Sequence, residues 1–133
     1  MENITRGGQF IVKETLAENI FTPEDFSEEQ KMMRDSVKEF VDRELWPHKI
    51  RFEQKDYAFT EETMRKAGEL GFLGVAVPEE FGGLGMGFVS TMLTCDYISG
   101  ASGSFSTAFG AHTGIGTMPI TLYGNDEQKN KYV

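Results

Sequence analysis

One run of 29 residues, 97–125, contains no Asp, Glu, Lys or Arg, although 26% of the chain is charged. Small side chains recur along this run at Gly103, Ser106, Gly110, Thr113, Gly114 and Thr117. Their three- and four-residue spacing places them on one face of a helix. A neighbouring face holds Phe105, Ala108, Phe109 and His112. Such a stripe favours close approach, because a slender apolar group or another helix can lie against the backbone there.

The glycines of this expected helix require an explanation. Each interior glycine costs about 1 kcal/mol relative to alanine, and Gly110, Gly114 and Gly116 all fall inside the run. Either another helix packs unusually close to them, or a ligand does. Both interpretations stay open on the residues alone.

The remaining candidate motifs favour ordinary structural roles. The glycines at 82, 83, 85 and 87 match neither the dinucleotide fingerprint nor the Walker pattern, so we predict a tight turn with positive φ angles. His112 has no second ligand at metal spacing, which predicts a histidine packed in the core and no metal site. Glu79 and Glu80 are adjacent, point in different directions, and do not form a general acid/base pair.

Composition excludes several classes of protein. The net charge of −8 and a pI near 4.7 argue against a nucleic-acid partner, since phosphate binding requires a basic face. A single cysteine, Cys95, excludes a disulfide within the chain and indicates a reducing, cytoplasmic setting, where we expect it to be a small buried apolar residue. The charge-free run is too rich in Ser, Thr and Gly for a transmembrane segment.

Helix signals begin after residue 26. Residues 1–26 show weak periodicity and predict a packed, extended arm with one helical turn. Ser27 and Gln30 form a capping box at a helix start. The apolar face of this helix follows as Met33, Val37, Phe40, Val41 and Leu45. Pro47 is expected to kink or end it.

Four more helices are expected. They run from Thr60 to Gly71 with Met64, Ala67 and Leu70 inward, from Phe88 to Ser99, from Gly103 to Tyr123, and from Asn125 onward. The predicted fold class is therefore all-α, an antiparallel helical bundle with an N-terminal extended arm. Residues 27–133 form the domain. Because Val133 lies only about two turns into the last helix, we expect the chain to be a piece of a longer protein.

Three segments together carry a more specific pattern. Residues 69–85 contain a Pro-x-x-x-Gly-Gly turn from Pro78, residues 107–116 contain the glycine stripe, and residues 123–132 contain Gly-x-x-x-Gln-Lys-x-Lys-Tyr. In this order and separation they resemble the N-terminal helical domain of the acyl-CoA dehydrogenase family. The segment 7–30 looks like the leader of bacterial members related to the very-long-chain enzymes.

The resemblance implies a flavoprotein that uses FAD to oxidise a fatty acyl-CoA to the trans-2-enoyl-CoA in fatty acid β-oxidation. In the family a carboxylate takes the α-proton while the β-hydrogen leaves as hydride to the flavin. A full member adds a middle β-domain and a second helical domain, which carry the catalytic Glu and most flavin contacts. The resemblance thus implies no catalytic residue in this chain, electron-transfer flavoprotein as the acceptor, and a homo-oligomeric parent.

The resemblance also gives the glycine stripe a role, as the wall of an acyl pocket deep enough for long chains. The residues expected to line it are Phe105, Ser106, Phe109, Gly110, Thr113 and Gly114. Two alternatives remain: a related flavoenzyme of the acyl-CoA oxidase type, and a helical interaction module without a cofactor.

Overall fold

The computed structural model describes residue 5 and residues 7–133, and no β-strand occurs among them. The α-helices are α1 (Gln9–Val12), α2 (Glu28–Phe40), α3 (Lys49–Glu53), α4 (Tyr57–Glu69), α5 (Phe88–Ala101), α6 (Gly103–Gly110), α7 (Met118–Tyr123) and α8 (Asp126–Tyr132). Two π-helical segments, Val41–Leu45 and Ala111–Thr117, continue α2 and join α6 to α7. The predicted all-α class is confirmed, and the one run that could have been a strand, 75–77, is not one.

Helix α2 begins where the capping box predicts. The Ser27 hydroxyl accepts a hydrogen bond from the Gln30 amide at 3.2 Å, and the Ser27 amide donates to the Gln30 side chain at 3.0 Å. All five predicted core residues of this helix are buried, namely Met33, Val37, Phe40, Val41 and Leu45. The last two lie in the π-helical segment, and Pro47 follows in a 3-10 turn, Trp46–His48, as the regular run ends.

Helix α4 begins three residues earlier than the predicted start at Thr60. Asp56 is its N-cap, because one carboxylate oxygen accepts from the Phe59 amide at 3.1 Å. The Thr60 hydroxyl instead donates to the Asp56 carbonyl at 2.9 Å from within the first turn. Ala67 is buried as predicted, but Leu70 is exposed at the C-terminal end of the helix.

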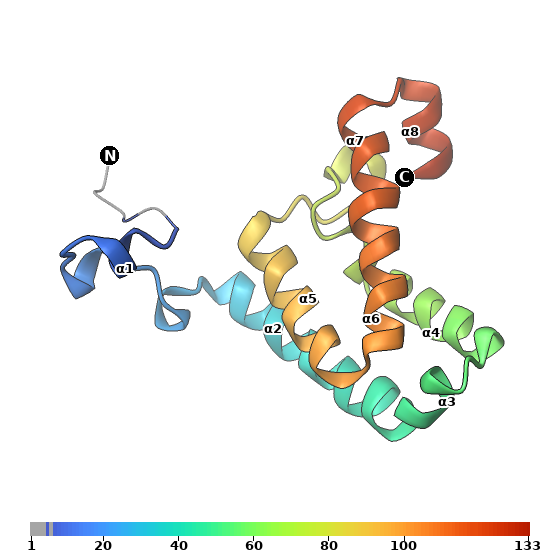
Figure 1. Cartoon of the computed structure of the whole chain (residues 1–133). Helices are drawn as coiled ribbons and strands as arrows, with labels where there is room; N and C mark the ends of the chain where they lie inside the picture. Colours follow the sequence, from blue (N-terminus) through green and yellow to red (C-terminus); the bar gives the residue numbers. More distant parts are fainter. Residues whose placement is uncertain (1–4, 6) are drawn as a thin grey trace.

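The core forms where α2, α3, α5 and α6 meet. Helices α2 and α5 lie side by side, and α6 turns back from the end of α5 (Figure 1). At the junction Phe105 is fully buried, with its ring 5.2 Å from that of Phe52 and 6.4 Å from that of Phe40, centroid to centroid. These aromatic contacts fix the direction in which the charge-free helix leaves the bundle.

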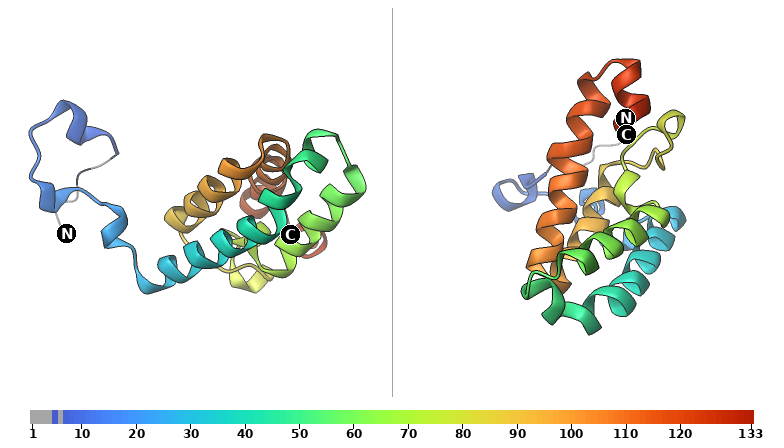
Figure 2. Two further views of the ribbon diagram at one scale, coloured as in Figure 1. Left: turned by 90° about the horizontal axis from the view of Figure 1, so that it is seen from below. Right: turned by 90° about the vertical axis from the view of Figure 1, so that its right-hand side faces the viewer.

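The predicted helix from Gly103 to Tyr123 is confirmed as one continuous rod made of α6, the π-helical segment and α7 (Figures 1 and 2). Ser102 caps its start by accepting from the Phe105 amide at 3.2 Å. The Ser102 hydroxyl also donates to Glu53 at 3.2 Å, which ties the start of the rod to the end of α3. The rod is therefore held firmly at its N-terminal end.

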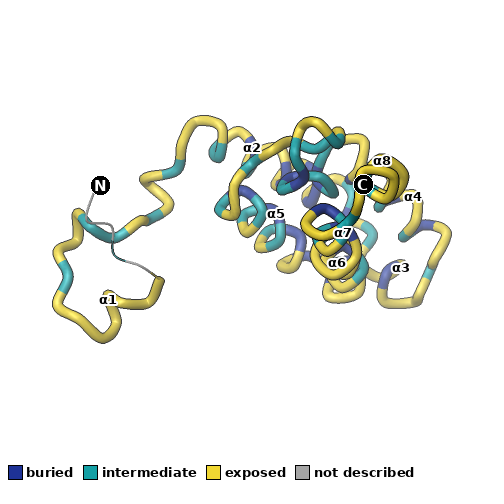
Figure 3. The backbone as a smooth tube through the Cα atoms, turned by 90° about the horizontal axis from the view of Figure 1, so that it is seen from above, coloured by how far each residue is buried: buried dark blue, intermediate teal, exposed yellow. Residues whose placement is uncertain are grey.

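The N-terminal arm extends away from the bundle (Figures 1 and 2), and most of its described length is exposed (Figure 3). Its single α-helical turn is α1, as predicted. The prediction that the arm is packed is wrong, since Phe10, Ile11, Val12 and Leu16 are all exposed. The arm is too short to surround these side chains with a core of its own.

Among residues 5 and 7–133, no helix combines the length and the apolar character needed to cross a membrane.

Candidate functional site

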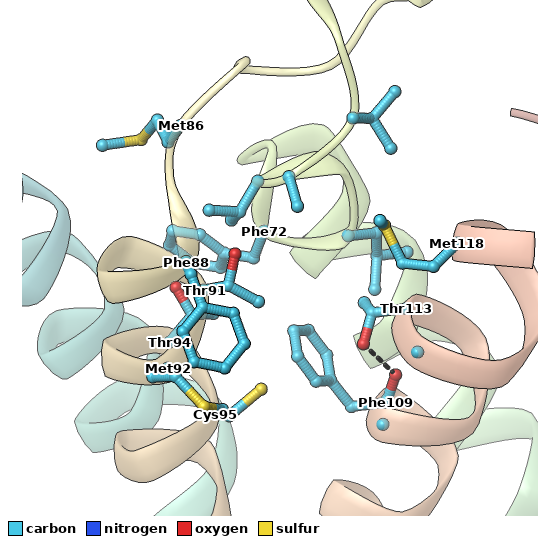
Figure 4. A pocket seen from close by; sticks show the side chains of 16 residues that line it. Phe72, Met86, Phe88, Thr91, Met92, Thr94, Cys95, Phe109, Thr113 and Met118 are labelled. Atoms are coloured by element: carbon cyan, nitrogen blue, oxygen red, sulfur yellow. Dashed lines mark hydrogen bonds between the residues drawn. The ribbon is translucent and has the colours of Figure 1, made fainter. Parts of the chain in front are cut away.

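An apolar cavity of about 540 Å³ lies between α5, the long rod and the segment that joins α4 to α5 (Figure 4). The joining segment contributes Phe72, Leu73, Val75, Ala76, Val77 and Met86, α5 contributes Phe88, Thr91, Met92, Thr94 and Cys95, and the rod contributes Phe109, Gly110, Thr113, Gly114 and Met118. The volume falls within the range of about 300–1,000 Å³ that is common for small-molecule sites.

Four of the six residues predicted from the glycine stripe lie on this wall: Phe109, Gly110, Thr113 and Gly114. Phe105 does not, because it is one turn nearer the start of the rod and is enclosed by the core. Ser106 does not either, and its hydroxyl is directed at the Gly103 carbonyl at 3.5 Å. The structure thus brings together the later part of the predicted set and separates the first turn from it.

The glycines of the rod have two different surroundings. A Cβ atom placed on Gly110 or Gly114 would meet no heavy atom within 4 Å, so no helix of the described chain packs against them. A Cβ on Gly116 would instead lie 3.1 Å from the Ala111 carbonyl, inside the π-helical turn. Gly116 therefore relieves crowding in the backbone, whereas Gly110 and Gly114 leave space in the cavity.

The π-helical segment forms the middle of the rod wall. Pro119 follows it by two residues and has no amide hydrogen to donate to the preceding turn. Missing donors of this kind are a recognised cause of local helix distortion. The Thr113 hydroxyl donates to the Phe109 carbonyl at 3.0 Å (Figure 4), so the segment adds little unsatisfied polarity to the cavity.

The opposite wall depends on the glycine turn between residues 82 and 87. Gly82 and Gly85 adopt φ angles of 84° and 61°, as predicted for this turn. The turn folds back so that the Gly85 amide donates to the Val77 carbonyl at 2.8 Å. The Met86 amide likewise donates to the Val75 carbonyl at 2.9 Å. These bonds place Met86, Val75 and Val77 together on the cavity wall, which gives the turn a structural role.

None of the side chains lining the cavity is charged, and its polar groups are few. The Thr94 hydroxyl is occupied by the Ser90 carbonyl at 2.9 Å. Burial raises the pKa of the Cys95 thiol, so this cysteine is mostly protonated at neutral pH. The cavity can therefore hold an apolar chain, but it contains no carboxylate base and no cation for phosphate groups.

Two predictions about histidine and metals have different outcomes. His112 is exposed on the rod, so the prediction of a core histidine is wrong; it points away from the side on which Phe109 is buried. Within the described part of the chain, no cluster of His, Cys, Asp and Glu could hold a metal ion.

Sequence reasoning missed the walls supplied by α5 and the joining segment. A signal existed for α5, since its residues 88–95 are apolar or small on nearly every side. A helix that is apolar all round must be covered on more than one face. The joining segment 72–77 gave only a short apolar run, which does not reveal its partner.

Comparison with known proteins identifies the class to which this fold and cavity correspond. The family model described as acyl-CoA dehydrogenase, N-terminal domain, matches residues 27–133. The chain therefore belongs to the acyl-CoA dehydrogenase family, as the three-segment pattern indicated. The match covers the same range, 27–133, that was predicted as the domain.

Individual relatives give a finer view. The chain is 40% identical over 131 residues to a probable acyl-CoA dehydrogenase of Bacillus subtilis, covering 98% of this chain and 22% of that protein. It is 35% identical over 109 residues to the mitochondrial isovaleryl-CoA dehydrogenase of Solanum tuberosum, covering 81% of this chain and 26% of that one. The chain thus spans only about a quarter of these relatives.

Solved structures agree. An acyl-CoA dehydrogenase from Bacillus anthracis, complexed with FAD, superposes with a TM-score of 0.83 at 45% identity, covering 95% of this chain and 22% of the other. A chain from the structure of the electron transferring flavoprotein of Acidaminococcus fermentans gives a TM-score of 0.73 at 30% identity, covering 84% and 29%. Relatedness to the very-long-chain branch in particular is not shown by these matches.

Proposed function

We propose that the parent protein is an FAD-dependent acyl-CoA dehydrogenase, and that the cavity of this domain receives the acyl chain of its substrate. The observation that carries the proposal is the uncharged cavity beside Gly110 and Gly114, inside a domain of this family. The reaction would convert an acyl-CoA to the trans-2-enoyl-CoA, with the domain holding and aligning the chain.

The open space beside the two glycines favours long acyl chains. Each methylene moved from water into an apolar wall contributes about 0.8 kcal/mol, or roughly a fourfold gain in affinity. Relatives also include isovaleryl-CoA dehydrogenases and a glutaryl-CoA dehydrogenase of Desulfococcus multivorans. A short or branched substrate, outside fatty acid β-oxidation, is therefore the competing assignment.

The residues of the cavity do not fit FAD. A dinucleotide needs donors or cations for its phosphates, and the cavity wall supplies neither. The FAD-bound relative from Bacillus anthracis is over four times as long as this chain, so we assign the flavin site and the catalytic base to the rest of the parent. This chain alone is expected to bind no FAD, which fluorescence titration of the flavin measures directly.

The test of the acyl-pocket proposal is Gly110→Leu in the parent enzyme. The added side chain enters the cavity, so kcat/KM should fall at least tenfold for a sixteen-carbon acyl-CoA and change little for a four-carbon one. Turnover of the acyl-CoA series with an artificial electron acceptor supplies both values.

Gly103→Leu is the matched control. Gly103 lies on the same helix, and a Cβ there also meets nothing within 4 Å, but it is outside the cavity. This variant should leave the chain-length profile unchanged. An equal loss of activity at every chain length for Gly110→Leu would overturn the acyl-pocket assignment.

Further properties of the parent belong to the same proposal. The similarity to a chain in an electron transferring flavoprotein structure supports a flavoprotein acceptor, and we expect a homo-oligomer in the bacterial cytoplasm. An acyl-CoA oxidase would reduce oxygen directly, so the rate of peroxide formation by the parent separates the two enzymes. A non-catalytic interaction module would show no turnover with any acyl-CoA.

A further inference from the structure

The N-terminal arm presents apolar side chains that nothing in the described chain covers. Ile11 and Val12 are 75% and 80% exposed, and Phe10, Leu16 and Phe21 are also exposed. Single exposed apolar residues are normal on a protein surface, but a group of five on about a dozen residues indicates a contact surface.

The arm has local structure without having a core. The Thr5 amide donates to the Asn19 carbonyl at 2.9 Å and closes a loop around α1. The Thr22 amide donates to the Asp25 carboxylate at 2.8 Å in a capping box, and the rings of Phe21 and Phe26 lie 5.7 Å apart. A segment already shaped in this way loses less conformational entropy when it docks on a partner.

The lengths of the relatives indicate what the partner is. The Bacillus subtilis relative that aligns over 131 residues must include the arm, and 131 residues are 22% of it, so it has about 600 residues. A second acyl-CoA dehydrogenase of the same organism aligns over 107 residues, the length of the domain without the arm, at 28% of about 380 residues. The arm therefore accompanies about 200 additional residues.

The solved relative follows the longer pattern. Its alignment covers 95% of this chain, which extends into the arm, and only 22% of its own length. The mitochondrial isovaleryl-CoA dehydrogenases align over 80–81% of this chain at 25–27% of their own, and the domain alone accounts for that coverage.

We propose that the arm docks on the additional segment that distinguishes the longer members, within the same polypeptide, through the apolar surface formed by Phe10, Ile11, Val12, Leu16 and Phe21. Residues 7–26 carry one Lys and four acidic residues, a net charge of −3. The receiving surface is thus apolar with a basic rim. The proposal rests on the parent being a long member of the family and is independent of its substrate.

Photocrosslinking in the full-length parent tests the docking directly. A photoreactive amino acid at position 16 should link to peptides of the additional segment, in a product that keeps the mass of one chain on a denaturing gel. A product of doubled mass would show docking on a second copy and overturn the proposal. Links only to the remaining domains, or no links, would also overturn it.

A pair of variants tests the chemistry of the contact. Ile11→Asp places a charge in the apolar surface, whereas Gln9→Asp adds the same charge to a polar, exposed position of the same helical turn. Deuterium exchange of residues 9–20 in the full-length parent should be at least tenfold faster in Ile11→Asp than in Gln9→Asp. Equal rates would contradict the proposal. Neither measurement uses catalytic activity, so failure of the proposed function leaves both interpretable.

Discussion

Gly110 and Gly83 occur in this chain for opposite reasons, and the same substitution distinguishes them. Gly110 has helical angles, φ −67° and ψ −35°, and open space where a Cβ would stand. Gly83 lies against residue 77, where a Cβ would overlap the Val77 carbonyl. We therefore expect Gly110→Ala to raise the free energy of unfolding by up to about 1 kcal/mol. Gly83→Ala should lower it by about 1–3 kcal/mol.

Urea unfolding of the two variants beside the unsubstituted chain measures both effects. The unsubstituted chain would then be less stable than it could be at Gly110, which is understandable if the space serves a ligand. A stability loss in Gly110→Ala as large as that in Gly83→Ala would mean that position 110 is packed.

Phe105 also has a residue-scale test, because the sequence assigned it to the pocket and the structure assigns it to the core. Its side chain is fully buried against Phe40 and Phe52. Phe105→Ala should therefore cost about 3–5 kcal/mol of unfolding free energy, as is usual for deleting a buried aromatic ring. Calorimetric or urea unfolding that shows a loss below about 1 kcal/mol would return Phe105 to the cavity wall.

At the scale of elements, sequence reasoning located helices through their caps and periodicity. The start of α2 followed from Ser27 and Gln30, whereas the start of α4 was misplaced because Asp56 was not recognised as a cap. The π-helical segments were missed, although each ends two residues before a proline, Pro47 or Pro119. A proline within an apolar helical run was the available signal, since it removes a donor from the regular ladder.

The cap of α4 makes stability depend on pH. Hydrogen bonds from Arg51 and from the Phe59 amide hold the pKa of Asp56 below its ordinary value. Because the folded pKa is the lower one, this stabilisation is complete above the unfolded pKa near 3.8 and is lost as the pH falls through the folded value. Asp56→Asn keeps a capping side chain but loses the charge.

The unsubstituted chain should therefore be more stable than Asp56→Asn at pH 6, and the difference should shrink steadily below pH 4. Urea unfolding of both proteins across this range gives the difference at each pH. A difference that stays constant from pH 6 to pH 3 would show that the Asp56 charge does not contribute.

At the scale of the whole molecule, the class could be predicted and the cavity could not. The glycine stripe identified one wall, because periodicity reports which residues share a face of a single helix. The other walls come from α5 and from the segment around Val75, Val77 and Met86, which the glycine turn folds back. Contacts of this kind depend on tertiary packing, which no pattern local to one element records.

The surface left by this packing predicts how the chain behaves on its own. Phe88 on α5, Ile115 in the π-helical segment and Leu122 on α7 are all largely exposed, and they lie outside the arm. Apolar groups at these positions in contact with water favour association between copies. We expect the average mass of the isolated chain to rise above its monomer value of 14.9 kDa as concentration increases.

Size-exclusion chromatography with light scattering measures this mass, and two variants assign the surface responsible. Leu122→Asp places a charge on the rod and should shift the association to higher concentration. Ile50→Asp places the same charge on α3, at a residue equally open to solvent but on a different element, and should leave the association unchanged. A monomer at every concentration would contradict the prediction. Equal effects of the two variants would show that the rod does not direct association, because any loss of exposed apolar surface would then suffice.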